Sequence, residues 1–358
     1  MPGLRLSQPP KSRGLAVSAL AASLVVFFGI GVLAVAGLTN AESDTLARTI
    51  AWVLISVGMI LAAIPVIVSI NALTQSGRAT KLVREDHVLI ARSHASRSRE
   101  LSLIALGLLV AVAVLTGFVL LLVSNDASVQ KTFLRWDIIG ETAGVVTKAF
   151  GMNLFIAVVA EIIVLVFGLA LAIARMLPGR AGAPIRWLAI AYIDVMRAVP
   201  AIIVIYLVGF GLPLAGIPIL KDFSPTWFAI IALALTYSAY VAETYRSGIE
   251  SIHASQISAS RSLGFSFAQT MRLVVLPQAV RIVIPPLLTM FIGLQKDTAL
   301  VNVIGAMDAF NQAKYVSATQ YNLSSVTVVA ILFVIITIPQ TRLVDWWLDR
   351  GKKMRGGR

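Results

Sequence analysis

Long uncharged hydrophobic stretches alternate with short basic segments along this 358-residue chain. An α-helix rises ~1.5 Å per residue, so roughly 20 apolar residues are needed to cross a hydrocarbon core of about 30 Å. Five stretches reach that length without a charge: Leu15–Leu38, Ile50–Leu73, Leu101–Val123, Ala198–Leu220 and Phe223–Ala242. Each of these stretches predicts a membrane-spanning helix.

Three further stretches complete the pattern. Gly151–Ala174 is interrupted only by Glu161, and Leu323–Thr341 leads into a pair of tryptophans. Ile282–Gln295 is shorter and contains a proline pair, so this span takes extra length from Leu276 onward and is expected to bend at the prolines, which cannot donate to the helical ladder. The pattern predicts an all-α integral membrane protein with eight transmembrane helices.

Composition and charge agree with this interpretation. Hydrophobic residues make up 58% of the chain and charged residues 13%, whereas soluble domains carry roughly 25% charged residues. The net charge of +13 follows the positive-inside rule, because 23 of the 30 Lys and Arg residues fall on one side when the N-terminus is cytoplasmic. Both termini are therefore predicted to be cytoplasmic, and the basic balance indicates topology and contact with membrane lipid instead of nucleic-acid binding.

The sequence lacks the motifs of enzymes that act on nucleotides or peptides. It contains no GxxxxGK[ST] loop, HExxH or GxSxG pattern, no Cys, and only three His, all in predicted loops. We expect no catalytic residue, no metal site and no cofactor held by this chain. This chain therefore cannot itself be an ATP-driven motor.

The segment from Tyr245 to Pro277 is too long and too regular for a simple connection. Apolar residues at three- and four-residue spacing predict a short amphipathic helix, a turn at Gly264 and a second helix that re-enters the membrane at Leu276–Pro277. An interfacial helix lying on lipid headgroups and a helix that docks a partner protein both fit this pattern.

This segment resembles the permease subunits of binding-protein-dependent polar amino-acid ABC importers, of the histidine, glutamine and glutamate type. Their loop has the form EAA, three residues, Gly, nine residues, Ile, one residue, Leu-Pro. Here Ser258-Ala259-Ser260 stands at EAA and Gly264 at the Gly, with Val274 at the Ile and Leu276-Pro277 at the end. Further matches are "YIDVMRAVP" from Tyr192, "GLP" from Gly211, "AYVAE" from Ala239 and "KDTAL" from Lys296.

The resemblance implies a C-terminal five-span permease core with a cytoplasmic coupling helix. An ATPase dimer would dock on that helix, a solute-binding protein would deliver substrate from outside, and a second core, either another copy or a related chain, would complete the channel. The residues expected at the ATPase contact are Gln256, Ser258, Ala259, Ser260, Arg261 and Gly264. Coupling also needs a rigid joint to the spans, for which we assign Pro277, Pro285 and Pro286; the alternative is that these prolines only shape a short span.

A charge in the middle of a span is costly, so Glu161 must face a cavity or another helix. Asn153 and Glu161 share one helix face, which is predicted to line the substrate path. The alternative is a structural hydrogen bond from Glu161 to a neighbouring span, such as the one that carries Thr236 and Tyr240. Near the outer mouth, the substrate-path residues are expected to be Gln295, Lys296, Asp297 and Thr298, although a capping and topology role explains the Lys-Asp pair as well.

These observations predict four regions. Residues 1–125 form a three-span accessory region, 126–150 an extracytoplasmic connector, 151–347 the permease core with its loop at 245–277, and 348–358 a basic tail. The predicted function is ATP-driven import of a polar amino acid, glutamate, glutamine or a basic amino acid, across a bacterial inner or plasma membrane. The alternatives are a stand-alone secondary transporter and a membrane scaffold that does not transport.

Overall fold

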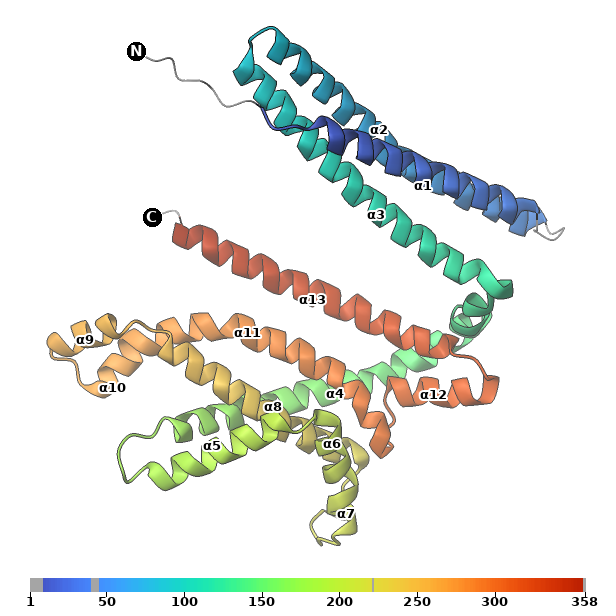
Figure 1. Cartoon of the computed structure of the whole chain (residues 1–358). Helices are drawn as coiled ribbons and strands as arrows, with labels where there is room; N and C mark the ends of the chain where they lie inside the picture. Colours follow the sequence, from blue (N-terminus) through green and yellow to red (C-terminus); the bar gives the residue numbers. More distant parts are fainter. Residues whose placement is uncertain (1–8, 40–44, 221, 357–358) are drawn as a thin grey trace, which may run out of the picture. The chain divides into compact units, whose positions relative to one another are not determined.

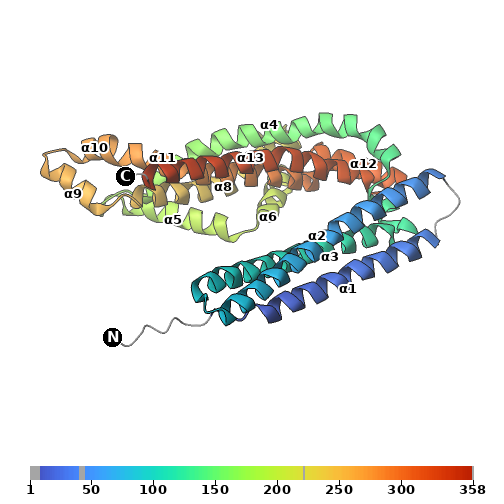
Figure 2. The same cartoon turned by 90° about the horizontal axis from the view of Figure 1, so that it is seen from above.

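The computed structural model describes residues 9–39, 45–220 and 222–356, and the regular elements in these ranges are all helical (Figures 1 and 2). Contacts divide the chain into two compact units, Met1–Val129 and Gln130–Arg358. Each unit has its own packing.

The first unit consists of long helices that pack through small side chains. They are α1 (Arg13–Thr39), α2 (Thr45–Arg84) and most of α3 (Val88–Phe133). Alanines and serines are buried between them, and the Ser23 and Ser69 hydroxyls lie 3.2 Å apart. Small residues let helix backbones approach closely where lipid removes the hydrophobic driving force.

The second unit is built around three long helices, α4 (Trp136–Arg175), α8 (Pro225–Glu250) and α11 (Leu276–Asp297). Shorter elements connect them: α5 (Ala183–Ala198), α6 (Ala201–Tyr206), the π-helical η1 (Leu207–Gly211), α7 (Leu212–Leu214), α9 (Ala254–Ser262), α10 (Phe267–Thr270), the π-helical η2 (Met271–Val275) and the 3₁₀ segment η3 (Thr298–Ile304). The unit ends with α12 (Ala309–Gln320) and α13 (Ser324–Gly356).

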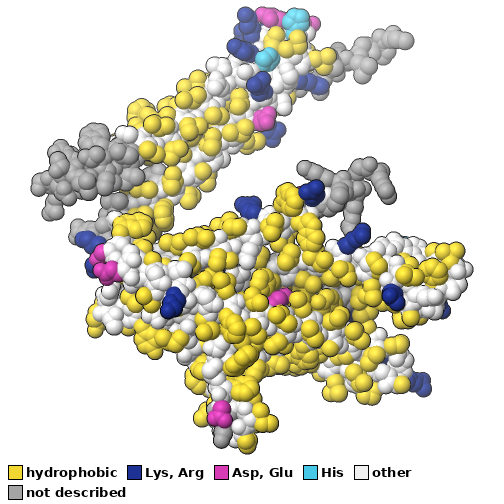
Figure 3. Space-filling model, turned by 180° about the vertical axis from the view of Figure 1, so that it is seen from behind, with side chains coloured by type: hydrophobic (Ala, Val, Ile, Leu, Met, Phe, Trp, Pro, Cys, Tyr) yellow, Lys and Arg dark blue, Asp and Glu magenta, His cyan; other side chains and the backbone are white. Residues whose placement is uncertain are grey.

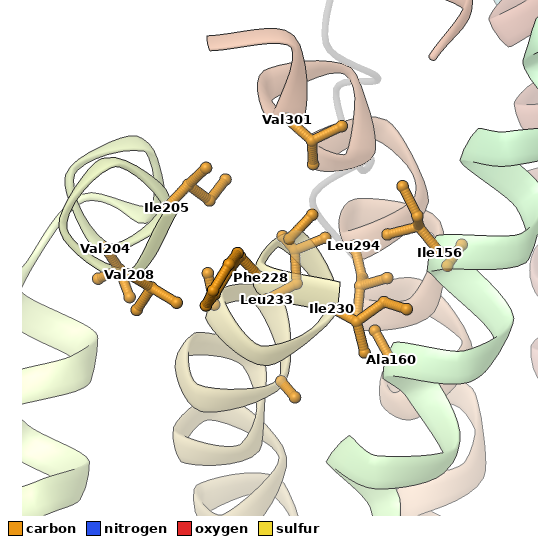
Figure 4. Packing of buried hydrophobic residues seen from close by; sticks show 14 of the residues in the cluster. Ile156, Ala160, Val204, Ile205, Val208, Phe228, Ile230, Leu233, Leu294 and Val301 are labelled. Carbon is orange, nitrogen blue, oxygen red and sulfur yellow. The ribbon is translucent and has the colours of Figure 1, made fainter. Parts of the chain in front are cut away.

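Helix α8 packs against both α4 and α11, as Figures 1 and 2 show. A β-carbon at Gly168 of α4 would lie 2.7 Å from Val241 Cγ1 of α8, so only glycine allows this approach. The core seen in Figure 4 joins Ile156 of α4 to Ile230 and Leu233 of α8 and to Leu294 of α11. This core joins the three helices that carry most of the polar residues described below.

The predicted all-α membrane fold is confirmed. Among the described residues, seven helices are long and apolar enough to cross a membrane, and a bent pair makes an eighth if it counts as one span. Which side the termini occupy stays a prediction.

The span predicted over Ala198–Leu220 is not one continuous helix. Helix begins at Ala183 and runs to Ala198, and the pair Ala183–Ala198 and Ala201–Leu214 is bent by 104°. Pro200 disfavours helical geometry in the residue before it, and Val199 is accordingly extended. The charged residues of 183–197 led us to predict a loop there. Ala189 and Ile193, four residues apart, are instead the buried residues on one face of a helix.

Helices also continue through the predicted regional boundaries. The division between units falls after Val129, and α3 and α4 occupy most of 126–150. Helix α13 extends into the predicted basic tail as far as Gly356, and residues 357–358 lie outside the described residues. The roles assigned to the four regions stay predictions.

Candidate functional site

A polar pocket of about 330 Å³ opens among α6, α8 and α11. Its lining residues are Ala201, Thr236, Tyr237, Tyr240, Met290 and Asp297. Thr236 and Tyr240 are one helical turn apart on α8, with Tyr237 beside them, so one face of that helix supplies half of the lining. Asp297 is the last residue of α11 and closes the pocket from the facing helix.

Asp297 provides the carboxylate of this pocket. The Tyr237 hydroxyl donates to Asp297 Oδ2 at 2.8 Å. Among the described residues, Asp297 takes part in no ion pair, and no Lys or Arg is among the lining residues. A carboxylate flanked by phenol groups suits an ammonium or guanidinium group, because charge-assisted hydrogen bonds and cation–π contacts both favour a cation there.

A charged side chain lies at the edge of the pocket lining. The Arg197 guanidinium carbon is 5.9 Å from the centre of the Tyr240 ring, and the Tyr240 hydroxyl donates to the Arg197 carbonyl at 3.3 Å. These contacts join the end of α5 to α8. They fix the Tyr240 ring next to the break at Val199–Pro200, where the bent span turns.

The predicted substrate-path residues fall into separate groups. Thr236, Tyr240 and Asp297 line the pocket, whereas Lys296 is exposed and is not among the lining residues. Tyr237 was not among the expected site residues. Its neighbours on α8 were an available signal, but its bond to Asp297 joins positions 60 residues apart.

Asn153 is the centre of a second polar cluster and is fully buried. Its Nδ2 donates to Thr298 Oγ1 at 3.1 Å and to Asp308 Oδ2 at 3.0 Å, and its Oδ1 accepts from the Ala309 backbone at 2.9 Å. The side chain therefore ties α4 to η3 and to the start of α12. That Asn153 lines the substrate path stays a prediction, since these hydrogen bonds also give the side chain a structural role.

Asp308 was not among the predicted site residues, although an Asp directly before a helix is a common N-cap. Its Oδ1 accepts from the Asn311 backbone at 2.9 Å and so caps α12. Burial raises the pKa of the Asp308 carboxyl, because the lost hydration outweighs the hydrogen bonds from Asn153 and from the backbone.

Two predicted path residues have buried polar atoms without hydrogen-bond partners among the described residues. They are Glu161, at Oε2, and Gln295, at both side-chain amide atoms. Four α8 hydroxyls donate elsewhere: Thr236 to Ala232, Tyr237 to Asp297, Ser238 to Ala234 and Tyr240 to Arg197. The alternative of a structural hydrogen bond from Glu161 to this helix stays a prediction as well. The substrate-path prediction for Glu161 stays open.

The segment 254–270 forms the predicted helix, turn and second helix, which we call the knob. It projects from the ends of α8 and α11 in Figure 1. Gly264 has φ +88°, and the backbone N–H groups of Gly264 and Phe265 close the end of α9 onto Arg261 and Ser260. Ser266 and Gln269 then form a capping box that starts α10.

The expected ATPase-contact residues divide between the surface and the interior of the knob. Ser258, Ala259 and Arg261 are exposed, and Ser260 is buried with its hydroxyl 3.0 Å from Thr270 Oγ1. Gln256 Oε1 accepts from Gln278 Nε2 of α11 at 2.6 Å. Leu263 is 78% exposed and Phe267 67%, so the knob presents apolar side chains beyond its polar surface.

Three prolines had been assigned to the joint between the knob and the spans. Pro277 lies in the first turn of α11, and Pro285 and Pro286 lie inside this helix, which continues through them. Their hinge role stays a prediction.

An ionic cluster lies where α4 and α8 end. Glu243 accepts from Arg246, which also pairs with Glu250, and the Arg175 guanidinium is 3.2 Å from Glu243 Oε2. Glu243 belongs to the "AYVAE" match, but its partner Arg175 is 68 residues away in the sequence. The cluster joins the end of α4 to the end of α8, and the knob projects from the end of α8.

Comparison with known proteins gives consistent matches, and the family match lies within the second unit. The family described as "Binding-protein-dependent transport system inner membrane component" matches residues 165–352. The probable glutamine ABC transporter permease protein GlnM of Bacillus subtilis is 35% identical over 189 residues, which are 52% of this chain and 84% of that protein. The glutamate/aspartate import permease protein GltK of Escherichia coli O157:H7 is 37% identical over 167 residues, 45% of this chain and 73% of that protein.

A solved structure matches as well. The crystal structure of "an amino acid ABC transporter with histidines" has 29% sequence identity and a TM-score of 0.56 to this chain, and the match covers 61% of this chain and 99% of the other. The described fold and the sequence matches therefore point to the same group of proteins.

Proposed function

This chain belongs to the family of binding-protein-dependent transport system inner membrane components, and we propose that it forms the translocation path for ATP-driven import of a polar amino acid. Relatives named for glutamine and for glutamate and aspartate support the substrate class. A relative from Bacillus subtilis that is 33% identical over 196 residues is named an arginine transport system permease protein. The localisation that follows is a bacterial inner or plasma membrane.

The pocket of Tyr237, Tyr240 and Asp297 is the observation that carries this proposal. Every amino acid has an ammonium group, and the Asp297 carboxylate beside two phenol groups is a suitable acceptor for it. The pocket volume of about 330 Å³ falls at the lower end of the range for small-molecule sites. An amino acid passing between α6, α8 and α11 would therefore meet a polar site inside an otherwise apolar core.

Energy for transport is proposed to come from a partner ATPase that docks on the knob. Exposed Leu263 and Phe267 give such a partner an apolar anchor, and exposed Ser258 and Arg261 give it polar contacts. The bond between Gln256 and Gln278 connects the knob directly to α11, whose other end carries Asp297. ATP and Mg²⁺ would bind on that partner, a solute-binding protein would deliver substrate from outside, and a second core would complete the path.

The test is reconstitution of the whole chain in liposomes with its ATPase and binding protein. Substrate-stimulated ATP hydrolysis and uptake of labelled glutamine, glutamate and arginine are measured for wild type, for Asp297→Asn and for the exposed control Asp222→Asn. We expect Asp297→Asn to lose at least about tenfold in uptake, the value of one charge-assisted hydrogen bond, and the control to keep wild-type rates. Uptake without any ATPase would identify a secondary transporter, and no uptake by any combination would favour a scaffold.

A further inference from the structure

The three-helix unit lies outside the family match and contains a pocket of its own. The pocket has a volume of about 320 Å³ and lies where α1 begins, against α2 and α3. Lys11, Ser12, Arg13 and Gly14 line it from one side, and Ser76 and Thr80 of α2 line it from the other. It is therefore a site that the transport core does not supply.

Positive charge gathers around this pocket. The described segments 9–14 and 74–100 contain eight Lys or Arg residues and three Asp or Glu residues. Figure 3 shows the Lys and Arg side chains collected at one end of the three-helix unit, with hydrophobic side chains along its length. Among the described residues, neither Lys11 nor Arg13 takes part in an ion pair.

One neutral hydrogen-bond donor completes the lining, since Thr80 already donates to the Ser76 carbonyl at 2.9 Å. Ser12 donates to Ser76 Oγ at 3.2 Å, so the hydroxyl hydrogen of Ser76, which is 2% exposed, is available to another acceptor. Helix α1 is 27 residues long, and the backbone N–H groups of its first turn add positive potential at the same place. Two cations, a buried hydroxyl and a helix start together form a site for an anion with several oxygen atoms.

The depth of the pocket identifies the class of anion. Arg13 comes two residues before the apolar stretch that begins at Leu15, and Ser76 comes three residues after the stretch that ends at Leu73. At ~1.5 Å per residue, Ser76 lies about 4–5 Å and Thr80 about 10 Å beyond the apolar part of α2. Headgroup regions occupy about 5–8 Å on each side of the hydrocarbon core, which is the level at which lipid phosphate groups lie.

We propose that this pocket binds the phosphate group of an anionic phospholipid. Basic pockets between helices at the membrane surface have this property in general, and the position of Lys11 and Arg13 at headgroup depth provides both the charge and the location. The three-helix unit would then sense the lipid composition of the membrane. This inference does not depend on the transport function.

The experiment uses the whole chain purified in detergent and titrated with phosphatidylglycerol, with native mass spectrometry as the readout of bound lipid. Lys11→Gln/Arg13→Gln is expected to weaken binding about thirtyfold, equivalent to ~1 kcal/mol for each basic residue. The matched control is Arg78→Gln/Arg84→Gln, which removes the same charge from exposed positions outside the pocket lining. It is expected to bind within about threefold of wild type.

A second variant separates the pocket from its charge. Gly14→Phe keeps Lys11 and Arg13 and adds a large side chain at a lining residue, where a β-carbon has no atom within 4 Å and is therefore tolerated. We expect it to reduce phosphatidylglycerol binding while the α-helical circular dichroism signal is unchanged. Wild-type binding by Gly14→Phe, equal losses in the pocket and control pairs, or no preference over phosphatidylcholine would each overturn the proposal. Displacement of the lipid by millimolar inorganic phosphate would overturn the lipid assignment and identify a soluble phosphate ligand.

Discussion

Replacing Gly264 tests whether the knob transmits force. Its φ of +88° lies in the left-handed region, where a residue with a β-carbon costs roughly 1–2 kcal/mol and a β-branched residue costs more. A β-carbon at this position has no atom within 4 Å, so Gly264→Val adds backbone strain without a steric clash. The effect is therefore confined to the turn between α9 and α10.

The loop can respond to that strain in either of two ways. It can keep its shape and carry the cost, or it can relax and lose the two backbone bonds to Arg261 and Ser260, which are 3.0 and 3.2 Å long and contribute roughly 0.5–1.5 kcal/mol each. In either case the free-energy difference between the native knob and other loop shapes shrinks. The population of the native knob relative to those shapes falls by about one to two orders of magnitude. The free energy of unfolding of the whole chain falls by the same small amount, so the protein still inserts.

The assay is substrate-stimulated ATP hydrolysis and uptake in liposomes containing the partner ATPase and binding protein. We expect Gly264→Val to abolish both activities and Gly264→Asn, which tolerates left-handed geometry, to retain most of them. Gly179→Val is the matched control, because Gly179 has φ +72° and equally open space but lies in the turn between α4 and α5. Wild-type uptake by Gly264→Val, or an equal loss in Gly179→Val, would refute the reasoning.

Three further predictions concern stability in detergent. Gly168→Ala is expected to destabilise the chain by about 1–3 kcal/mol, because the new β-carbon would lie 2.7 Å from Val241 Cγ1, whereas Gly151→Ala on the same helix has open space and should leave the melting temperature unchanged. Asn153→Ala removes the donor to the buried Asp308 carboxylate and the acceptor of the Ala309 backbone N–H, and it should cost about 2–4 kcal/mol in denaturant unfolding; a loss below about 0.5 kcal/mol would contradict the cluster. Burial raises the pKa of the Asp308 carboxyl above its usual 3.8. At pH values above about 4 the native state therefore keeps the carboxyl proton that the unfolded chain has lost. The free energy of unfolding falls as the pH rises from about 4 through the raised pKa. Asp308→Asn should flatten that slope at pH values above about 4, and an unchanged slope would assign it to another group.

The sequence predicts the spans well because lipid imposes a local rule. A helix in hydrocarbon must be apolar over its whole length, and this requirement can be read from about 20 consecutive residues. The span through Pro200 departs from the rule because α5 is amphipathic, with Ala189 and Ile193 buried and charged Asp194 and Arg197 exposed. A search for uncharged runs treats such a helix as a loop.

The knob was also predictable, since its determinants are local. The turn at Gly264 and the capping box of Ser266 and Gln269 depend on residues within four positions of each other. The polar clusters could be predicted only in part, because Asn153 and Asp308 lie 155 positions apart and Tyr237 and Asp297 lie 60 apart. Hydropathy and spacing indicate which polar residues have a high free-energy cost of burial. They do not indicate which of these residues are in contact.

Helix α11 connects the features that the proposed transport function needs. Near its start, Gln278 donates to Gln256 of the knob, and its last residue, Asp297, accepts from Tyr237 in the pocket. The next residue, Thr298, accepts from Asn153 and so joins the same helix end to α4 and to α12.

The 22 residues of α11 extend about 33 Å, so a displacement of the knob that moves α11 as a rigid body must change either the Tyr237–Asp297 bond or the Asn153 cluster. If α11 instead flexes at Pro285 and Pro286, the knob can move while both polar contacts persist, and the pocket would then be insensitive to the ATPase. If the proposed function holds, coupling of ATP hydrolysis to substrate release therefore requires that α11 stay rigid through these prolines.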